Sequence, residues 1–174
     1  ELCCYLLPGK MKRPAVLVIP GGGYGGVCEA TEGEPIARKF NELGFHAFVL
    51  HYRVAPHRFP EPQEDVFRAI RLIRANAGKW CVTPNQLAVC GFSAGGHLAA
   101  SAGTLYGEIH ADAGDEADSQ EMRPNALILC YPVISFTDFP HLGSGKNLLG
   151  ERFDECRERY SLEKRVSEKT PPAF

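Results

Sequence analysis

The sequence predicts an α/β fold in which helices cover both faces of a mostly parallel sheet. Short, continuous apolar runs alternate along the 174 residues with segments in which apolar residues recur at helical spacing. The 18 glycines and 13 prolines gather between these segments, as expected of tight connections. Because parallel strands are joined by right-handed crossovers, this alternation places helices on both faces of one sheet.

Five segments are predicted to be strands. The run 15–19, Ala-Val-Leu-Val-Ile, is apolar throughout, which is typical of a strand buried on both faces. Segments 45–50, 87–90 and 126–130 have the same character and are bounded by turn residues. The apolar segment 2–7 is predicted to be the fifth strand.

Apolar residues at helical spacing predict three helices between the strands. Ile36, Phe40 and Leu43 lie at positions i, i+4 and i+7. Pro35 suits the first turn of this helix, and Gly44 suits a left-handed residue at its end. The same spacing recurs in two further segments, at Val66, Ile70, Ile73 and Ala77 and at Ala94, Leu98, Ala102 and Leu105.

Residues 1–174 are predicted to form a single, partial domain, truncated at both ends. A complete fold of this class needs more than five strands, and the chain opens at Glu1 within an apolar segment. Residues 131–170 are irregular, with a charged helix expected over 151–166, and are predicted to form a cap or insert over the sheet edge. The outer edge of strand 126–130 is expected to be unpaired, which favours aggregation.

Composition and charge exclude several classes of protein. With 19 basic and 21 acidic residues, the formal net charge of -2 offers no cationic surface for nucleic acid. No apolar run approaches the roughly 18 residues of a membrane helix. Seven cysteines without a C-x-x-C pair favour reduced thiols and a cytoplasmic location, although a secretion signal before Glu1 stays an open alternative. The acidic segment 108–121 lacks the spacing of a calcium loop and is expected to be a solvated excursion.

The segment Gly91-Phe92-Ser93-Ala94-Gly95 matches the pattern G-x-S-x-G between a predicted strand and a predicted helix. A serine on so sharp a turn projects above the carboxyl ends of the strands, and small residues at positions 91 and 95 let the strand and helix approach. Ser93 is therefore predicted to be a catalytic nucleophile. The alternative is a glycine-rich turn in which the serine only caps the helix.

A second glycine motif, Pro20-Gly-Gly-Gly-Tyr24, follows the strand 15–19. Glycines expose backbone N–H groups to a ligand, and these amides are predicted to form an oxyanion hole together with the amide of Ala94. A phosphate-binding loop is a poor alternative, because no Lys-Ser/Thr pair follows. A flexible linker is the other alternative.

In these motifs the sequence resembles the α/β-hydrolase superfamily, and within it the carbohydrate esterases of the hormone-sensitive-lipase-like type, bacterial acetyl-xylan esterases in particular. The resemblance covers nearly the whole chain and rests on Pro20-Gly-Gly-Gly-Tyr24, Tyr52-Arg-Val-Ala-Pro56, Gly91-Phe-Ser-Ala-Gly-Gly-His-Leu-Ala-Ala100 and Cys130-Tyr-Pro-Val-Ile134. It implies an α/β-hydrolase fold and a serine esterase that removes acetyl or other short acyl groups from carbohydrates such as acetylated xylan, without a metal or an organic cofactor.

The resemblance also implies roles for individual residues. Ser93 would be the nucleophile, with Gly22, Gly23 and Ala94 as oxyanion donors, although the choice among the glycines is open by one position. Tyr24 and Tyr131 are expected either to line the acyl or sugar pocket or to be core residues at strand ends.

The other members of the catalytic triad are not assigned within the chain. In the superfamily the acid and then the histidine follow the nucleophile, on loops after the last strands, so both are expected beyond residue 174. The isolated chain is accordingly expected to be nearly inactive. His97, one turn after Ser93 on the same helix, is expected to have a packing role.

Two other functions stay open at this point: a serine peptidase of the prolyl-oligopeptidase kind, and a hydrolase-fold protein that binds small molecules without turnover. The expected partner is a small-molecule or oligosaccharide acyl ester. Neither nucleic acid nor a membrane is expected as a partner, and the oligomeric state is left open.

Overall fold

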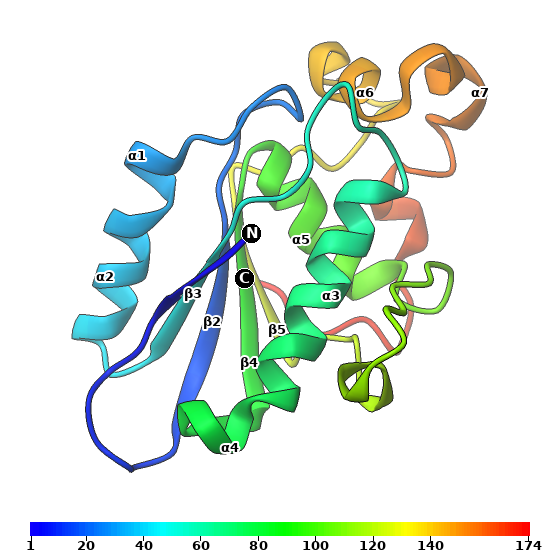
Figure 1. Cartoon of the computed structure of the whole chain (residues 1–174). Coiled ribbons are helices and arrows are strands. Elements are labelled where there is room, and N and C mark those ends of the chain that lie inside the picture. Colours follow the sequence, from blue (N-terminus) through cyan, green and yellow to red (C-terminus); the bar gives the residue numbers. More distant parts are fainter.

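The computed structural model describes residues 1–174 and shows a five-stranded sheet between two layers of helices (Figure 1). The strands lie in the order β1-β3-β2-β4-β5. Strands β2 to β5 pair in parallel, and β1 pairs antiparallel with β3. Their bounds are β1 Leu2–Tyr5, β2 Arg13–Ile19, β3 His46–Leu50, β4 Val82–Phe92 and β5 Ala126–Cys130. The predicted mostly parallel α/β sheet is confirmed.

Helices cover both faces of the sheet, as predicted. One face carries α1 (Glu29–Glu32) and α2 (Glu34–Glu42), and the other carries α3 (Glu61–Ala75) and α5 (Ala94–Thr104), with α4 (Ala77–Trp80) at the end of α3 (Figure 1). The remaining helices are α6 Leu142–Leu149, α7 Phe153–Cys156 and three 3₁₀ helices, Glu116–Ser119, Gly150–Arg152 and Leu162–Arg165. None of the helices combines the length and the apolar character that crossing a bilayer requires.

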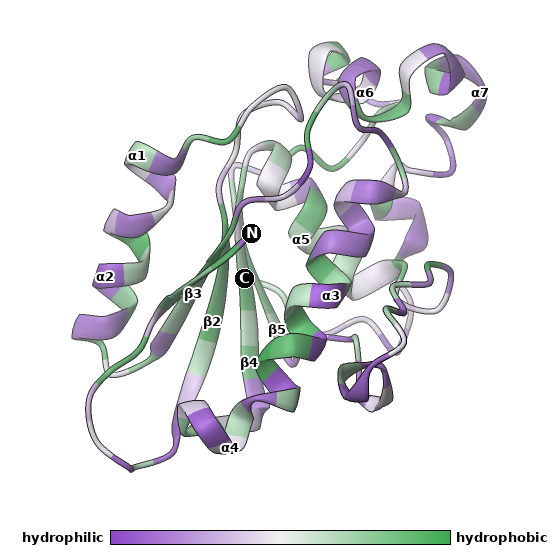
Figure 2. Ribbon diagram, in the orientation of Figure 1, coloured by the Kyte–Doolittle hydropathy of each residue, from purple (hydrophilic) through white to green (hydrophobic).

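Strand β2 shows how the core is divided between the two layers. Ala15, Leu17 and Ile19 belong to the larger apolar cluster, beneath α3 and α5. Val16 and Val18 point the other way, into the smaller cluster beneath α2. A strand buried on both faces therefore needs apolar residues at every position, which is why the run is continuous. Figure 2 shows the strands in the hydrophobic colour and the outer faces of the helices in the hydrophilic one.

The last residues of the chain pair with β5. The N–H of Leu127 donates to Pro172 O (2.9 Å), and the N–H of Phe174 donates to Leu127 O (3.0 Å). The N–H of Leu129 also donates to Phe174 O (2.8 Å). The expectation that the outer edge of β5 is unpaired is therefore wrong, since residues 172–174 cover part of it.

Residues 131–170 fold differently from the prediction. The single helix expected over 151–166 is broken into short turns, because Phe153, Tyr160 and Leu162 are all drawn into the larger apolar cluster at spacings that one helix cannot satisfy. Helix α6 was not predicted, since its two glycines weaken its helix propensity. One of them is required by packing, because a Cβ at Gly145 would lie 2.2 Å from the Phe153 ring. That the segment is a cap or insert stays a prediction.

The acidic segment 108–121 is exposed but is fixed to helix α3. The Asp112 carboxylate accepts a hydrogen bond from Arg71 Nη1 (2.6 Å), and Asp115 and Asp118 both pair with Arg68. The segment is therefore a surface excursion, as expected, and these pairs fix it to α3. A single sequence does not show that these aspartates pair with arginines of a helix 41 to 50 residues earlier.

Candidate active site

Ser93 lies on the turn between β4 and α5, with φ 51° and ψ −117°. A positive φ is strained for a residue with a side chain, and such strain persists only where the surroundings impose it. The residue is half-buried, and its hydroxyl makes no hydrogen bond to a protein group. The structure therefore presents an unengaged hydroxyl at the carboxyl end of the sheet.

The surroundings that impose this turn are two close backbone approaches. A Cβ at Gly91 would lie 2.2 Å from the carbonyl oxygen of Gly95, and a Cβ at Gly95 would lie 2.2 Å from the carbonyl oxygen of Ile19. Real Cβ atoms are never found so close to backbone atoms. The first contact holds β4 against α5, and the second holds α5 against the end of β2, so the two glycines explain why strand and helix can meet at Ser93.

The loop Pro20-Gly-Gly-Gly-Tyr24 is fixed through its carbonyl groups. All five accept hydrogen bonds: Pro20 O from Tyr52 Oη (2.9 Å), Gly21 O from Cys28 N (2.9 Å), Gly22 O from Gly25 N (3.0 Å) and Gly26 N (3.1 Å), Gly23 O from Asn147 Nδ2 (2.8 Å) and Tyr24 O from Ala55 N (2.8 Å). Three of these six donors follow the loop directly in the chain, and the other three belong to Tyr52, Ala55 and Asn147. Every carbonyl group of the loop is therefore engaged within the protein.

The amides of Gly22, Gly23 and Tyr24 donate to no protein acceptor. The loop passes directly beside the serine, because a Cβ at Gly21 would lie 3.1 Å from the Cβ of Ser93. The amide of Ala94, in the first turn of α5, has no acceptor within its own helix. Three predicted site residues, Gly22, Gly23 and Ala94, thus bring unpaired N–H groups to the neighbourhood of Ser93.

Glu32, at the end of α1, is a site residue that the sequence analysis missed. Its Oε2 accepts a hydrogen bond from the Gly21 amide (2.6 Å), and its Oε1 accepts one from the Tyr131 hydroxyl (2.7 Å). One carboxylate thereby holds both the glycine loop and the residue that follows β5. No sequence pattern links a glutamate to a glycine 11 positions earlier, so only the folded chain reveals the contact.

Tyr131 lies on the open side of this site. The residue is 67% exposed, and its ring packs against the ring of Phe92, with 5.9 Å between the centroids. The Glu32 carboxylate, which accepts its hydroxyl proton in a hydrogen bond, raises the pKa of Tyr131 to about 12. The phenol therefore stays protonated at neutral pH and is available as a donor or as an apolar surface.

Tyr24 has a different position from Tyr131. Its side chain is completely buried, and its hydroxyl lies 2.9 Å from Nδ1 of His97. Nε2 of His97 lies 3.0 Å from the carbonyl oxygen of Tyr160, which can only accept, so Nε2 carries the proton and Nδ1 accepts from Tyr24. Burial lowers the pKa of His97 to about 4 and raises that of Tyr24. The Tyr24 side chain thus belongs to the packing beneath the loop, which was the alternative in the sequence analysis.

None of the six histidines forms a hydrogen bond with the Ser93 hydroxyl. His97 is held by Tyr24 and Tyr160, and the others lie in separate environments: His46 accepts from the Leu7 amide, His51 pairs with Glu29, His57 with Glu61 and His141 with Ser144, while His110 lies in the exposed acidic segment. No group of three or more His, Cys, Asp or Glu residues is arranged to hold a metal ion. The structure therefore brings backbone donors beside the serine without pairing a histidine with its hydroxyl.

The fold and the strand-turn-helix serine define this chain as an α/β-hydrolase domain. It is similar to a solved α/β-hydrolase enzyme from a Medee basin deep-sea metagenome library, with a TM-score of 0.69 and 33% identity over 99% of this chain and 61% of that one. It is also similar to the acetyl ester-xyloside bifunctional hydrolase from Caldicellulosiruptor lactoaceticus, with a TM-score of 0.92 and 43% identity over 99% of this chain and 64% of that one.

The BD-FAE family model matches residues 4–173, and the chain belongs to this family. Among curated relatives, it is 40% identical to endo-1,4-beta-xylanase B of Butyrivibrio fibrisolvens, over the whole of this chain and 28% of the relative. It is 33% identical to the acetylxylan esterase of Xylanibacter ruminicola, over 99% of this chain and 34% of the relative. The chain therefore spans about a third of the length of these two relatives.

Proposed function

We propose that the chain is the nucleophile-bearing part of a serine esterase that hydrolyses short acyl esters, acetyl esters above all, on carbohydrates such as acetylated xylan. The observation that carries this proposal is the unengaged hydroxyl of Ser93 on a strained turn, beside a loop with free amides at Gly22 and Gly23. A turn that served only to cap a helix would not need a second loop fixed beside it by all of its carbonyl groups.

The proposed reaction begins when the Ser93 oxygen attacks the ester carbonyl carbon and forms a tetrahedral intermediate. The amides of Gly22, Gly23 and Ala94 would donate to its oxyanion, and each such donor is typically worth about 3 kcal/mol of transition-state stabilisation. Collapse of the intermediate releases the sugar hydroxyl and leaves an acyl group on Ser93. Water then attacks this acyl-enzyme, releases the carboxylic acid and restores the serine.

The proton of Ser93 has to be taken by a base that residues 1–174 do not place within reach of it. We propose that a histidine oriented by an acidic residue, both outside this segment, supplies that base, as in the Ser-His-Asp arrangement. The isolated 174-residue chain should accordingly turn over activated esters very slowly. Tyr131, exposed beside Glu32, is proposed to line the substrate-binding face, because its ring offers a flat apolar surface that a sugar can contact.

Support for the carbohydrate ester comes from the relatives, whose names include an acetylxylan esterase and an acetyl ester-xyloside hydrolase. The test is hydrolysis of 4-nitrophenyl acetate and release of acetate from acetylated xylan by the protein that carries this chain. Ser93→Ala should lower kcat by at least about 10⁴-fold, since a triad serine is indispensable. The control is Ser101→Ala on the same helix, where the hydroxyl donates only to Leu98 O (2.7 Å), and it should leave kcat unchanged.

Three results would contradict the proposal. Equal rates of ester hydrolysis for the wild-type protein and Ser93→Ala would show that Ser93 is not the nucleophile. Faster cleavage of proline-containing peptides than of acetyl esters would favour the peptidase alternative. Ester binding without turnover in the complete protein would favour a non-catalytic binding protein.

A further inference from the structure

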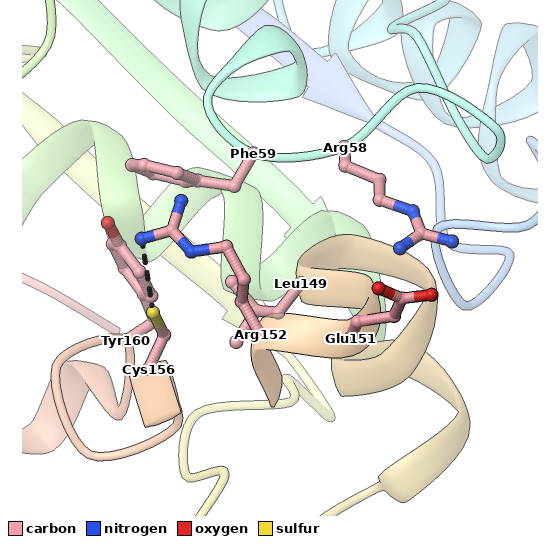
Figure 3. Close-up of a pocket in the computed structure, with 7 residues that line it drawn as sticks. All are labelled: Arg58, Phe59, Leu149, Glu151, Arg152, Cys156 and Tyr160. Carbon is pink, nitrogen blue, oxygen red and sulfur yellow. Dashed lines mark hydrogen bonds between the residues drawn. The ribbon is translucent and has the colours of Figure 1, made fainter. Parts of the chain in front are cut away.

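A cavity of about 260 Å³ lies between the loop that precedes α3 and the segment that contains α6 and α7. Figure 3 shows the side chains that line it. Arg58 and Phe59 come from the loop, whereas Leu149, Glu151 and Arg152 come from the end of α6 and the turn that follows it. The proposed reaction makes no use of this cavity.

The walls of the cavity are fixed by contacts between the two segments. The N–H of Phe59 donates to Leu148 O (2.9 Å), and the rings of Phe59 and Tyr160 pack with 4.2 Å between their centroids. Leu149 and Tyr160 are nearly fully buried and form an apolar floor. A preformed apolar floor favours a ligand that has an apolar face of its own.

The position of Arg58 depends on the glycine opposite to it. A Cβ at Gly150 would overlap the Arg58 guanidinium, at 1.4 Å from Nη1. Gly150 also has φ 61°, a conformation that side chains rarely adopt. The guanidinium therefore lies directly over the backbone of Gly150, at one side of the cavity.

The charged side chains of the cavity are exposed and form no ion pair within the protein. Neither Arg58 nor Arg152 forms an ion pair, and Arg152 donates only to the Cys156 sulfur (3.4 Å). Glu151 is also without an ionic partner, so two guanidinium groups and one carboxylate leave the lining with one net positive charge. In Figure 3 the two arginines stand on either side of Leu149. A guanidinium matches the geometry of a carboxylate, with which it forms paired hydrogen bonds.

We propose that this cavity binds a ring that carries a carboxylate, and specifically a uronic acid group of the polysaccharide whose acetyl esters the protein hydrolyses. The carboxylate would pair with Arg58 and Arg152, while the apolar face of the ring would lie on Leu149 and the aromatic pair. The choice of a sugar acid rests on the proposed function, whereas the preference for a carboxylate rests on the cavity alone.

The cavity is joined to the candidate active site through α6. Asn147, two residues before Leu149, donates to the carbonyl oxygen of Gly23 in the glycine loop (2.8 Å). Tyr160, which forms part of the floor, also accepts the Nε2 proton of His97 on the helix that begins at Ser93. A polysaccharide held at Ser93 could therefore extend over α6 and place a side group in the cavity.

The test is direct binding to the Ser93→Ala variant of the protein that carries this chain, so that turnover plays no part. Methyl β-D-glucuronide is titrated by calorimetry or NMR, beside methyl β-D-xyloside, which lacks the carboxylate, and benzoate, which lacks the sugar. We expect the glucuronide to bind at least about tenfold more tightly than either, corresponding to about 1.4 kcal/mol.

Single substitutions then assign the binding to the cavity. Arg58→Gln and Arg152→Gln should each weaken glucuronide binding roughly fivefold, and Glu151→Gln should strengthen it, a gain that misfolding cannot produce. The control Arg157→Gln removes the same charge from an exposed neighbour outside the cavity and should change nothing.

Several outcomes would overturn the inference. Equal affinity for the xyloside and the glucuronide would show that the cavity has no preference for a carboxylate. Tighter binding of benzoate would show that the ligand is not a sugar acid. If Arg157→Gln weakened glucuronide binding as much as Arg58→Gln or Arg152→Gln, the binding would depend on overall charge and not on the cavity. If Ser93→Ala leaves ester hydrolysis intact but the glucuronide binds as described, the proposed function fails while the cavity stands.

Discussion

The two glycine-rich turns beside Ser93 are shaped in different ways. The turn 91–95 is held by steric contacts among its own residues and the end of β2, where added Cβ atoms would lie 2.2 Å from backbone oxygens. The loop 20–24 has one such close approach, at Gly22, where an added Cβ would lie 2.2 Å from Gly26 O. It is also held by hydrogen bonds with the side chains of Glu32, Tyr52 and Asn147, which lie in other segments. The first turn is thus determined mainly by close packing, whereas the second depends in addition on side-chain partners from other segments.

This difference makes separate predictions for the two turns. Substitutions at the packed turn should act mainly on stability, because they force backbone atoms apart. Substitutions of the partners that hold the loop should act mainly on rate and on pH dependence, because the loop can shift without unfolding the sheet.

The largest effect is expected at the packed turn. Gly95→Ala should lower the free energy of unfolding by at least about 3 kcal/mol, since its Cβ would meet Ile19 O and Pro20 O at 2.2 and 2.4 Å. Thermal unfolding followed by circular dichroism would measure this as a Tm lowered by roughly 6 to 12 °C. The matched control is Gly26→Ala, where no atom lies within 4 Å of an added Cβ. Equal effects of the two substitutions would contradict the steric account.

The second effect concerns the buried pair beneath the loop. Because the pKa of His97 is lowered to about 4 in the folded chain and is near 6.5 when unfolded, acid protonates the unfolded state first. The contribution of His97 to stability is complete above about pH 6.5 and is lost as the pH falls toward 4, by up to about 1.4 kcal/mol per pH unit. The free energy of unfolding, measured with urea at several pH values, should depend less on pH in His97→Gln than in the wild-type chain. Parallel curves would contradict the assigned tautomer and its burial.

The third effect tests the carboxylate that holds the loop. Glu32→Gln keeps the size of the side chain but removes the charge that binds the Gly21 amide and the Tyr131 hydroxyl. We expect kcat to fall roughly tenfold and the pKa of Tyr131 to fall from about 12 toward its ordinary value near 10. Ultraviolet titration of the phenol measures the change in the pKa of Tyr131 independently of activity. Glu34→Gln, which alters an exposed pair with Arg38, is the control.

The smallest effect is expected from Tyr131→Phe. The substitution removes the hydroxyl from Glu32 but keeps the exposed ring against Phe92. We expect KM for acetylated xylan to change by no more than about threefold, because the hydrogen bond is exposed and the ring surface is retained. Tyr131→Ala should raise KM more than this. Equal KM values for the two variants would show that the Tyr131 ring does not contact the substrate.

The contrast between the two turns also explains what could be predicted from the sequence. The strand at 15–19 and the turn at Ser93 each carry a local sequence pattern, so both could be predicted, and the predicted fold is confirmed. The roles of Glu32 and Asn147 depend on where distant segments meet, for which a single sequence carries no signal. Helix α6 was missed for a related reason, because one of its two glycines, Gly145, packs against the distant Phe153 ring.

The most direct test of the account is a structure of the protein that carries this chain after reaction with an alkylphosphonate ester, a stable mimic of the tetrahedral intermediate. The account predicts a phosphorus bonded to the Ser93 oxygen, with a phosphonyl oxygen about 2.7 to 3.1 Å from amide nitrogens of Gly22, Gly23 and Ala94. A phosphonate bonded to another residue, or a phosphonyl oxygen that faces away from these amides, would contradict it.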